Sequence, residues 1–225
     1  MTTIVRDYPR PTDAQVRAFA KQAAATIHEA MGRRGAMDSA IKPIYPGMPF
    51  CGVALTCVCH ANDNLSLHVA LKIAKPGDVL VCAAGDYTEQ GLFGDVMSSC
   101  AKGAGVAGLV TDGGVRDRAT IREIGFPVYS RSVSIKGTVK ETLGPVNVPV
   151  SVGGVVVHPG DIVVGDDDGV VVVPRLEADA VLAACAKREE KESKMRAELI
   201  TGKTTWDMLK LADMLKAKGV IVNLD

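Results

Sequence analysis

The sequence lacks an excess of charge of either sign, since 26 Lys and Arg residues are matched by 26 Asp and Glu residues. This balance gives no global electrostatic attraction to nucleic acid or to an anionic membrane. No segment approaches the ~20 consecutive apolar residues of a membrane-spanning helix. The N-terminal residues also lack the apolar stretch of a signal peptide. We therefore expect a cytoplasmic protein with no nucleic-acid or membrane partner.

A Cys-x-x-Cys motif is missing too, although the chain contains six cysteines. Most of them lie in apolar runs, where cysteine behaves as a small buried hydrophobic residue. Cys57 and Cys59 point their sulfurs to one face of a predicted strand, but no second pair accompanies them. We therefore do not expect a structural zinc site.

The composition is that of an ordinary globular protein, with 47% apolar and 23% charged residues in a chain of 225. This length suffices to bury a sizeable core in one large domain, or in a domain with an appendage. Apolar periodicity and turn residues predict alternating helices and strands. Helices are expected at residues 13–31, 64–74 and 94–104. Strands are expected at residues 52–59, 79–83, 106–111, 126–129, 137–139, 148–152, 155–157, 161–164 and 169–173.

The character of the chain changes after Pro174. Residues 176–199 have the pattern of a long polar helix, with six consecutive charged residues at 187–192. Gly202 interrupts it, and residues 206–218 are expected to form a last amphipathic helix. A helix this polar cannot bury itself alone. We therefore expect a catalytic core of residues 1–175 and a C-terminal arm of residues 176–225 that packs on a neighbouring subunit.

The most informative residues lie on either side of one predicted helix and strand. Twenty residues separate Asp95 from Arg116, and a helix followed by a buried strand returns the chain to where it began. Asp95 stands at the helix start, where a carboxylate can cap free N–H groups. The N–H groups of Val96 and Met97 can then bind a substrate carboxylate.

Gly113-Gly114 is expected to form a tight turn directly before Arg116 and Asp117. A guanidinium at this point can stabilise a developing enolate oxygen, and a carboxylate can bind a hard divalent cation. On residue types alone, a surface salt bridge between Arg116 and Asp117 is the commoner arrangement. The neighbouring motifs are needed to choose between the two.

These motifs together resemble one enzyme family. They are Asp95-x20-Arg116-Asp117, the preceding Gly91-Leu92-Phe93-Gly94, Asp63-Asn64 with His68, Gly137-Thr138-Val139-Lys140, Asn147-Val148-Pro149-Val150 and Asp166-Asp167-Asp168-Gly169. Over residues 27–218 the chain is similar to the 4-hydroxy-4-methyl-2-oxoglutarate / 4-carboxy-4-hydroxy-2-oxoadipate aldolases. These are class II pyruvate aldolases in the superfamily of the regulator of ribonuclease E activity A.

The resemblance implies an α/β fold, with a three-layer β/β/α core of the swivelling type and a C-terminal helical arm. It also implies a homotrimer or homohexamer whose active sites lie between subunits, and Mg²⁺ or Mn²⁺ as the cofactor. The expected reaction is retro-aldol cleavage to pyruvate plus pyruvate or oxaloacetate, with oxaloacetate decarboxylase side activity. Breakdown of protocatechuate or gallate is the implied pathway.

Site roles follow from the resemblance position by position. Arg116 matches the arginine that contacts the pyruvyl oxygen, and Asp117 matches the aspartate that ligates magnesium. Asp95 matches the first motif aspartate. Gly94 and the backbone amides of Val96 and Met97 match the substrate-binding positions, although the family has leucines at the last two. The family also supplies a metal-site glutamate from the arm of the adjacent subunit. Glu189 is the best match to that glutamate, with Glu190 and Glu192 as alternatives.

Several alternatives remain open on the sequence. The chain could be a non-catalytic regulator of the ribonuclease E type, but the shorter members with that role lack the helical arm. A dedicated oxaloacetate decarboxylase would share the same motif. Asp166-Asp167-Asp168-Gly169 is interpreted as a hairpin turn and not as a cation site. His28 could support the site indirectly, but a helix-capping or surface role is commoner, and His68 is more often a core or surface residue than a catalytic one. Lys136 or Lys140 could form an imine with the substrate, but neither lies in a recognisable environment for a lowered pKa. The general base is unidentified.

Overall fold

The computed structural model describes residues 2–221. The chain forms two compact units, the first ending at Cys185 and the second beginning at Ala186. The boundary lies inside α6 (Ala178–Leu199), whereas the sequence places the division earlier, after the last strand.

A seven-stranded sheet in the order β1-β5-β4-β3-β2-β8-β9 forms the centre of the first unit. Its four middle strands are parallel, and the flanking strands are antiparallel to their neighbours. The residues before β1 also bond to β9, since Val172 N–H donates to Gly35 O at 2.9 Å, so the sheet nearly closes. The strand bounds are β1 (Lys42–Pro43), β2 (Phe50–Val58), β3 (Asp78–Ala83), β4 (Gly108–Val115), β5 (Val128–Val133), β8 (Ile162–Asp166) and β9 (Gly169–Val173).

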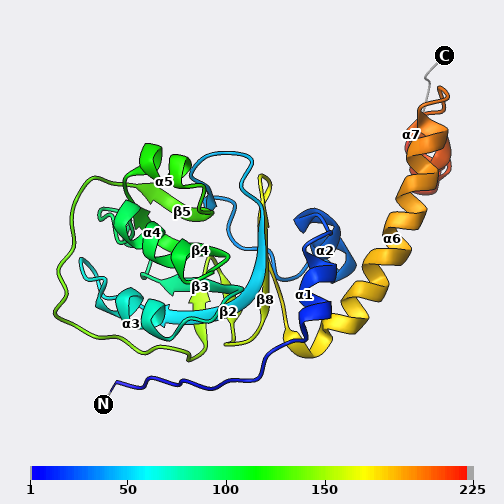
Figure 1. Cartoon of the computed structure of the whole chain (residues 1–225). Coiled ribbons are helices and arrows are strands. Elements are labelled where there is room, and N and C mark those ends of the chain that lie inside the picture. The colour runs from blue at the N-terminus through cyan, green and yellow to red at the C-terminus, as the bar shows by residue number, and fades with distance from the viewer. Residues whose placement is uncertain (1, 222–225) are drawn as a thin grey trace. The chain divides into compact units, whose positions relative to one another are not determined.

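The two faces of this sheet are covered differently (Figure 1). Helices α3 (Leu65–Ile73), α4 (Asp95–Gly103) and α5 (Arg118–Ile124) cover one face and bury one apolar cluster against it. The hairpin of β6 (Val150–Val152) and β7 (Val155–Val157) packs its valines on the other face. Strands buried on both faces explain the continuous apolar run of β3. The predicted α/β core of three layers is confirmed.

One predicted helix, at residues 13–31, is in fact two: α1 (Asp13–Phe19) and α2 (Ala24–Ala30). The chain leaves the helical conformation at Ala23, and the N–H of Ala24 donates to Asp166 Oδ2 at 2.8 Å. This carboxylate satisfies a free N–H group at the start of α2, as a capping side chain would. It comes from the far end of the first unit, so the local pattern could not reveal the break. Both helices pack on β8 and β9, together with the first turns of α6.

Gly113 and Gly114 do not form the predicted turn; they belong to β4, which continues to Val115. A Cβ at Gly114 would lie 2.4 Å from Gln90 O, and one at Gly113 would lie 2.7 Å from Ala84 Cβ. Glycine is needed here because neighbouring chain approaches the strand closely. Helix α5, which follows directly, was not predicted.

Residues 137–139 are not the expected strand either, because Val139 makes only an isolated bridge with Asp63. The Asp63 carboxylate holds this segment by accepting the N–H groups of Glu141 and Thr142, both at 2.7 Å. Its other oxygen accepts Leu65 N–H at 2.8 Å. Asp63 therefore binds the first N–H of α3 and also fixes the long segment between β5 and β6, whereas the side chain of Asn64, the N-cap residue, makes no capping bond.

The second unit is helical. It contains most of α6 and the short helices α7 (Thr205–Met208) and α8 (Leu211–Ala217). The predicted single helix at 206–218 is thus divided, and Lys210, with a φ of 51°, stands at the division. No helix in residues 2–221 is long and apolar enough to cross a membrane. The packing of this arm on another subunit stays a prediction.

Candidate active site

Backbone pairing brings the residues before α4 against the end of β4. Leu92 N–H donates to Gly114 O and Arg116 N–H donates to Phe93 O, both at 2.9 Å. These bonds place the first residues of α4 next to the residues that follow β4. The start of α4 and the end of β4 therefore meet as predicted, although strand-like backbone pairing and not a glycine turn brings them together.

Asp117 directs its carboxylate to this junction. Its Oδ2 accepts the Nε–H of Arg116 and the N–H of Asp95, each at 3.3 Å. The residue has a left-handed backbone, with a φ of 58°, and precedes α5 without capping it through its side chain. For a non-glycine residue this conformation costs about 1–2 kcal/mol, and such strain gathers at functional sites. The geometry favours a carboxylate aimed at Arg116 over one used for helix capping.

Gly94 makes room for this pair. A Cβ there would lie 2.3 Å from Asp117 Oδ2 and 3.0 Å from Arg116 Nε. Its φ of −132° suits any residue, so space and not conformational freedom requires glycine. Gly94 is therefore the residue whose small size permits the Arg116–Asp117 contact.

A pocket of about 280 Å³ opens beside Arg116. It contains two cationic side chains, Arg116 and Lys140, and three neutral polar ones. No acidic side chain among the described residues lines it, which favours a small anionic ligand. The lining residues are Asn64, His68, Leu92, Gly94, Val96, Met97, Arg116, Gly137, Thr138 and Lys140.

Two polar atoms of the lining residues have no hydrogen-bond partner within the described part of the chain: Asn64 Oδ1 and His68 Nε2. Asn64 is fixed by its amide nitrogen, which donates to Leu92 O at 2.8 Å. Burial lowers the pKa of His68 from 6.5, and the charge of Lys140 adds to this effect. The imidazole is therefore neutral at pH 7 and can accept a proton. Unpaired buried polar atoms are rare in native proteins, and a ligand in the pocket would satisfy both.

The start of α4 already contains one internal contact. Val96 N–H donates to Asp95 Oδ1 at 2.8 Å, so a ligand carboxylate that used this amide would replace Asp95. Met97 is buried, and its sulfur accepts the Asn64 amide at 3.4 Å. Asp95 and Asp117 are joined through the bond from Asp95 N–H. Their carboxylate oxygens are hard donors of the kind that Mg²⁺ and Mn²⁺ prefer, so the residues present fit a divalent cation.

The three candidate metal glutamates lie in the second unit, on α6. Glu189 pairs with Arg196, Glu190 with Lys194 at 2.7 Å, and Glu192 with Arg188 at 2.6 Å. These contacts are the ordinary ion pairs of an exposed helix. The role of Glu189 in a neighbouring subunit stays a prediction.

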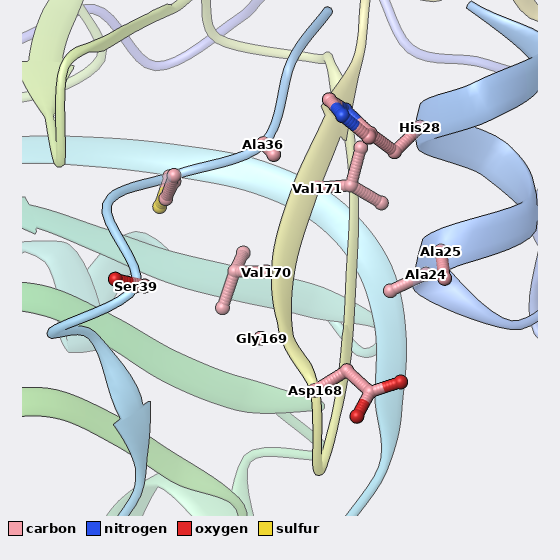
Figure 2. A pocket seen from close by; sticks show the side chains of 10 residues that line it. Ala24, Ala25, His28, Ala36, Ser39, Asp168, Gly169, Val170 and Val171 are labelled. Atoms are coloured by element: carbon pink, nitrogen blue, oxygen red, sulfur yellow. The ribbon is translucent and has the colours of Figure 1, made fainter. Parts of the chain in front are cut away.

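Other candidates lie away from this pocket. His28 lines a separate apolar pocket of about 250 Å³ beside β9 (Figure 2), and its Nδ1 lies 3.0 Å from Arg34 O. The Asp166–Gly169 run is the tight turn of the β8–β9 hairpin, as predicted. Lys136 forms an ion pair with Glu89 at 2.5 Å.

Sequence reasoning missed the contribution of His68 and Lys140 to the pocket. Both stand in motifs that the sequence analysis singled out, Asp63-Asn64 with His68 and Gly137-Thr138-Val139-Lys140. The signal was therefore present, but only the fold shows that the two motifs meet at Arg116.

Comparisons with known proteins agree with this fold. Residues 24–172 match the family described as RraA-like, Aldolase/RraA. A Halalkalibacterium halodurans protein named "Putative 4-hydroxy-4-methyl-2-oxoglutarate aldolase" is 38% identical over 173 residues, which are 76% of this chain and 82% of that protein.

Solved structures of similar fold include RNA-processing inhibitors. Streptomyces coelicolor RraAS2, described as an unusual member of the RNase ES inhibitor RraA protein family, matches with a TM-score of 0.75 and 33% identity. That match covers 84% of this chain and 100% of the other. The RNA-processing inhibitor RraA from Thermus thermophilis matches with a TM-score of 0.63 and 27% identity, over 68% of this chain and 93% of the other.

Proposed function

The chain belongs to the RraA-like family of aldolases and RraA proteins, and we propose that it is a divalent-metal-dependent pyruvate aldolase. Its substrate is 4-hydroxy-4-methyl-2-oxoglutarate or 4-carboxy-4-hydroxy-2-oxoadipate. The products are pyruvate plus a second molecule of pyruvate or oxaloacetate. The observation that carries this proposal is the contact between Arg116 and Asp117 at the mouth of a pocket lined by cationic and neutral polar side chains.

Arg116 supplies the main electrostatic stabilisation. As the bond between C3 and C4 of the substrate breaks, its electron pair forms an enolate, and negative charge builds on the 2-oxo oxygen. A guanidinium beside that oxygen stabilises the charge, and removing such a donor typically costs 10²–10³-fold in kcat. Asp117, with Glu189 of a neighbouring copy, would hold a divalent cation, which would supply Lewis-acid chemistry to the reaction.

His68 accepts the proton of the tertiary hydroxyl in this proposal. Its Nε2 is buried and lacks a partner within the described residues, and its lowered pKa keeps it neutral at pH 7. As that proton leaves, the hydroxyl carbon becomes the carbonyl of the second product. The enolate takes up a proton at C3 to give pyruvate. Loss of CO₂ from oxaloacetate leaves the same enolate, so decarboxylase side activity is expected.

Lys140 binds the second carboxylate of the substrate in this proposal. Lys140 lines the pocket together with Arg116. Its ammonium group is a compact point charge that attracts a carboxylate. The pocket volume of about 280 Å³ suits a small 2-oxo acid and not a polymer.

Exposed apolar residues near the pocket support a site completed by another subunit. Val96, which lines the pocket, is 77% exposed, and Ile135 is 94% exposed. Ile135 is held close by, since its neighbour Ser134 bonds to Val115 O at 2.8 Å. Exposed apolar side chains around a pocket often mark an interface. The proposed assembly is a homotrimer or homohexamer with sites between subunits.

The decisive experiment measures pyruvate release from 4-carboxy-4-hydroxy-2-oxoadipate, coupled to lactate dehydrogenase. Turnover is expected with Mg²⁺ or Mn²⁺, and it should be lost with EDTA and in Arg116→Ala. Arg118→Ala is the matched control, since Arg118 is exposed at the start of α5 and does not line the pocket. A folded oligomer that shows no turnover with either metal would refute the aldolase proposal.

The second candidate is a regulator of RNA processing without catalytic activity. It is favoured by the RraAS2 match, which spans the whole of that chain. Its test is inhibition of RNA cleavage by a purified ribonuclease of the E type. Inhibition by a protein that has no aldolase activity would put this candidate first.

A further inference from the structure

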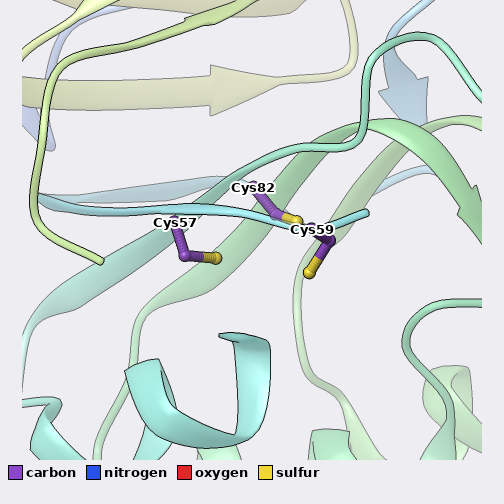
Figure 3. Close-up of side chains that lie close together, drawn as sticks. All are labelled: Cys57, Cys59 and Cys82. Atoms are coloured by element: carbon purple, nitrogen blue, oxygen red, sulfur yellow. The ribbon is translucent and has the colours of Figure 1, made fainter. Parts of the chain in front are cut away.

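Three cysteine side chains meet in the core of the first unit. Cys57 lies on β2 and Cys59 follows the last residue of that strand, while Cys82 lies on β3 as the direct neighbour of Cys57 in the parallel ladder. The three sulfur atoms all lie within 4.8 Å of one another (Figure 3). Cys59 is 4% exposed, and the other two side chains are fully buried. The Cys57-x-Cys59 pair seen in the sequence thus gains its missing third ligand from a strand more than twenty residues away.

The surroundings set one of these thiols apart. Hydrogen bonds from Cys57 and from Cys82 lower the pKa of Cys59, and the N–H of Leu67 contributes in the same direction. Leu67 is in the first turn of α3, so the positive end of that helix faces the sulfur. Hydrogen bonding to Cys59 raises the pKa of Cys57. Cys57 and Cys82 thus lie close to Cys59, the one thiol of the three whose pKa is lowered.

We propose that Cys57, Cys59 and Cys82 form a binding site for a single Cu⁺ ion, separate from the catalytic pocket. Thiolate sulfur is a soft ligand that selects Cu⁺ over the hard cations Mg²⁺ and Ca²⁺. With metal–sulfur bonds of about 2.3 Å, a planar three-coordinate site has sulfurs about 4.0 Å apart. The observed limit of 4.8 Å therefore needs shifts of less than about 1 Å to reach that geometry.

Coordination number favours Cu⁺ over Zn²⁺ at this position. Structural zinc sites are almost always four-coordinate, but within the described residues the cluster of possible ligands contains three sulfurs and no fourth group. The nearby carboxylate of Asp63 is already occupied by three backbone N–H groups. The apolar side chains of Leu55, Leu67 and Leu80 belong to the same core cluster as the three cysteines.

Binding is coupled to protons and to folding. Each thiol that coordinates as thiolate releases its proton to solvent, so affinity is expected to rise with pH. Because the site requires β2 and β3 to be paired, Cu⁺ binds the folded chain better than the unfolded one. The thermal midpoint should therefore increase when the ion is bound.

The test is a competition assay on the reduced, full-length protein under anaerobic conditions, with bicinchoninate as the competing Cu⁺ ligand. One Cu⁺ per chain should be retained by the wild type and by Cys100→Ser, the control in which an exposed cysteine is removed. Cys59→Ala and Cys82→Ala should each weaken retention at least tenfold. Failure of the wild type to retain Cu⁺, or equal loss in Cys100→Ser, would overturn the proposal.

A second measurement does not depend on variants that could unfold. X-ray absorption of the wild-type complex should show only sulfur neighbours, at about 2.3 Å. Nitrogen or oxygen ligands around the copper would overturn the proposal. So would a competition in which Zn²⁺ displaces Cu⁺ from the protein.

Discussion

Replacing Gly94 with alanine tests the site geometry most directly, because it adds one methyl group and removes no functional atom. The new Cβ would lie 2.3 Å from Asp117 Oδ2, a separation that no stable structure keeps. The carboxylate must move, and its contacts with Arg116 Nε and Asp95 N–H, both at 3.3 Å, are then lost. The expected result is a protein that folds but in which the carboxylate of Asp117, the proposed metal ligand, is displaced.

The magnitude follows from what the contact does. Displacing Asp117 removes the proposed ligand of the divalent cation and misaligns Arg116, so kcat should fall about 10²–10³-fold. Stability should change little, because a φ of −132° is allowed for alanine. Gly94 is the N-cap residue of α4, and alanine at such a position costs about 1 kcal/mol or less relative to glycine.

The assay is pyruvate release at saturating Mg²⁺, with thermal unfolding measured in parallel. Gly103→Ala is the matched control, since it lies at the other end of α4 and an added Cβ there meets no atom within 4 Å. That change should leave kcat unaltered and stabilise the protein by about 0.5–1 kcal/mol. If Gly94→Ala retained wild-type kcat in a folded protein, the Arg116–Asp117 contact could not be part of the catalytic machinery.

Three further predictions concern single side chains. His68→Gln should lower kcat/KM about 10²–10⁴-fold. Because burial lowers the pKa of His68 from 6.5, the activity of the wild type should decline only below pH 6.5, where the imidazole becomes protonated. If the variant kept this decline in activity, His68 could not be the base. Lys140→Ala should raise KM about tenfold or more, while proton exchange at the pyruvate methyl group, followed by NMR in D₂O, should stay unchanged because pyruvate has no second carboxylate. Arg10→Ala should destabilise the protein by about 3 kcal/mol in urea unfolding, because Arg10 pairs at 2.5 Å with the fully buried side chain of Asp78. Arg33→Ala, which removes the exposed ion pair with Glu29, should lower the free energy of unfolding by less than about 0.5 kcal/mol. Equal losses of stability in the two variants would contradict the burial of the Arg10–Asp78 pair.

Local pattern was sufficient where an element depends on its own residues. The apolar runs of β2 and β3 and the helical periodicity of α3 and α4 were predicted to within a few residues. The Asp-Gly signal between β8 and β9 gave the hairpin. Prediction failed where a distant residue intervenes: Asp166 separates α1 from α2, and Gln90 requires glycine at position 114.

The sequence by itself determined the α/β class, the order of the main elements and the motif residues Asp95, Arg116 and Asp117. The order of the elements follows from periodicity and turn residues, which are local properties of the chain, whereas the α/β class and the choice of these three residues rest on the resemblance of several motifs taken together. Only the tertiary structure decided that His68 and Lys140 share a pocket with Arg116, and that Cys82 completes a group of three sulfurs. The physical reason is that parallel strand pairing and loop packing join residues far apart along the chain. The free energy of such contacts depends on the register of the whole sheet, and this register cannot be read from any single segment of the sequence.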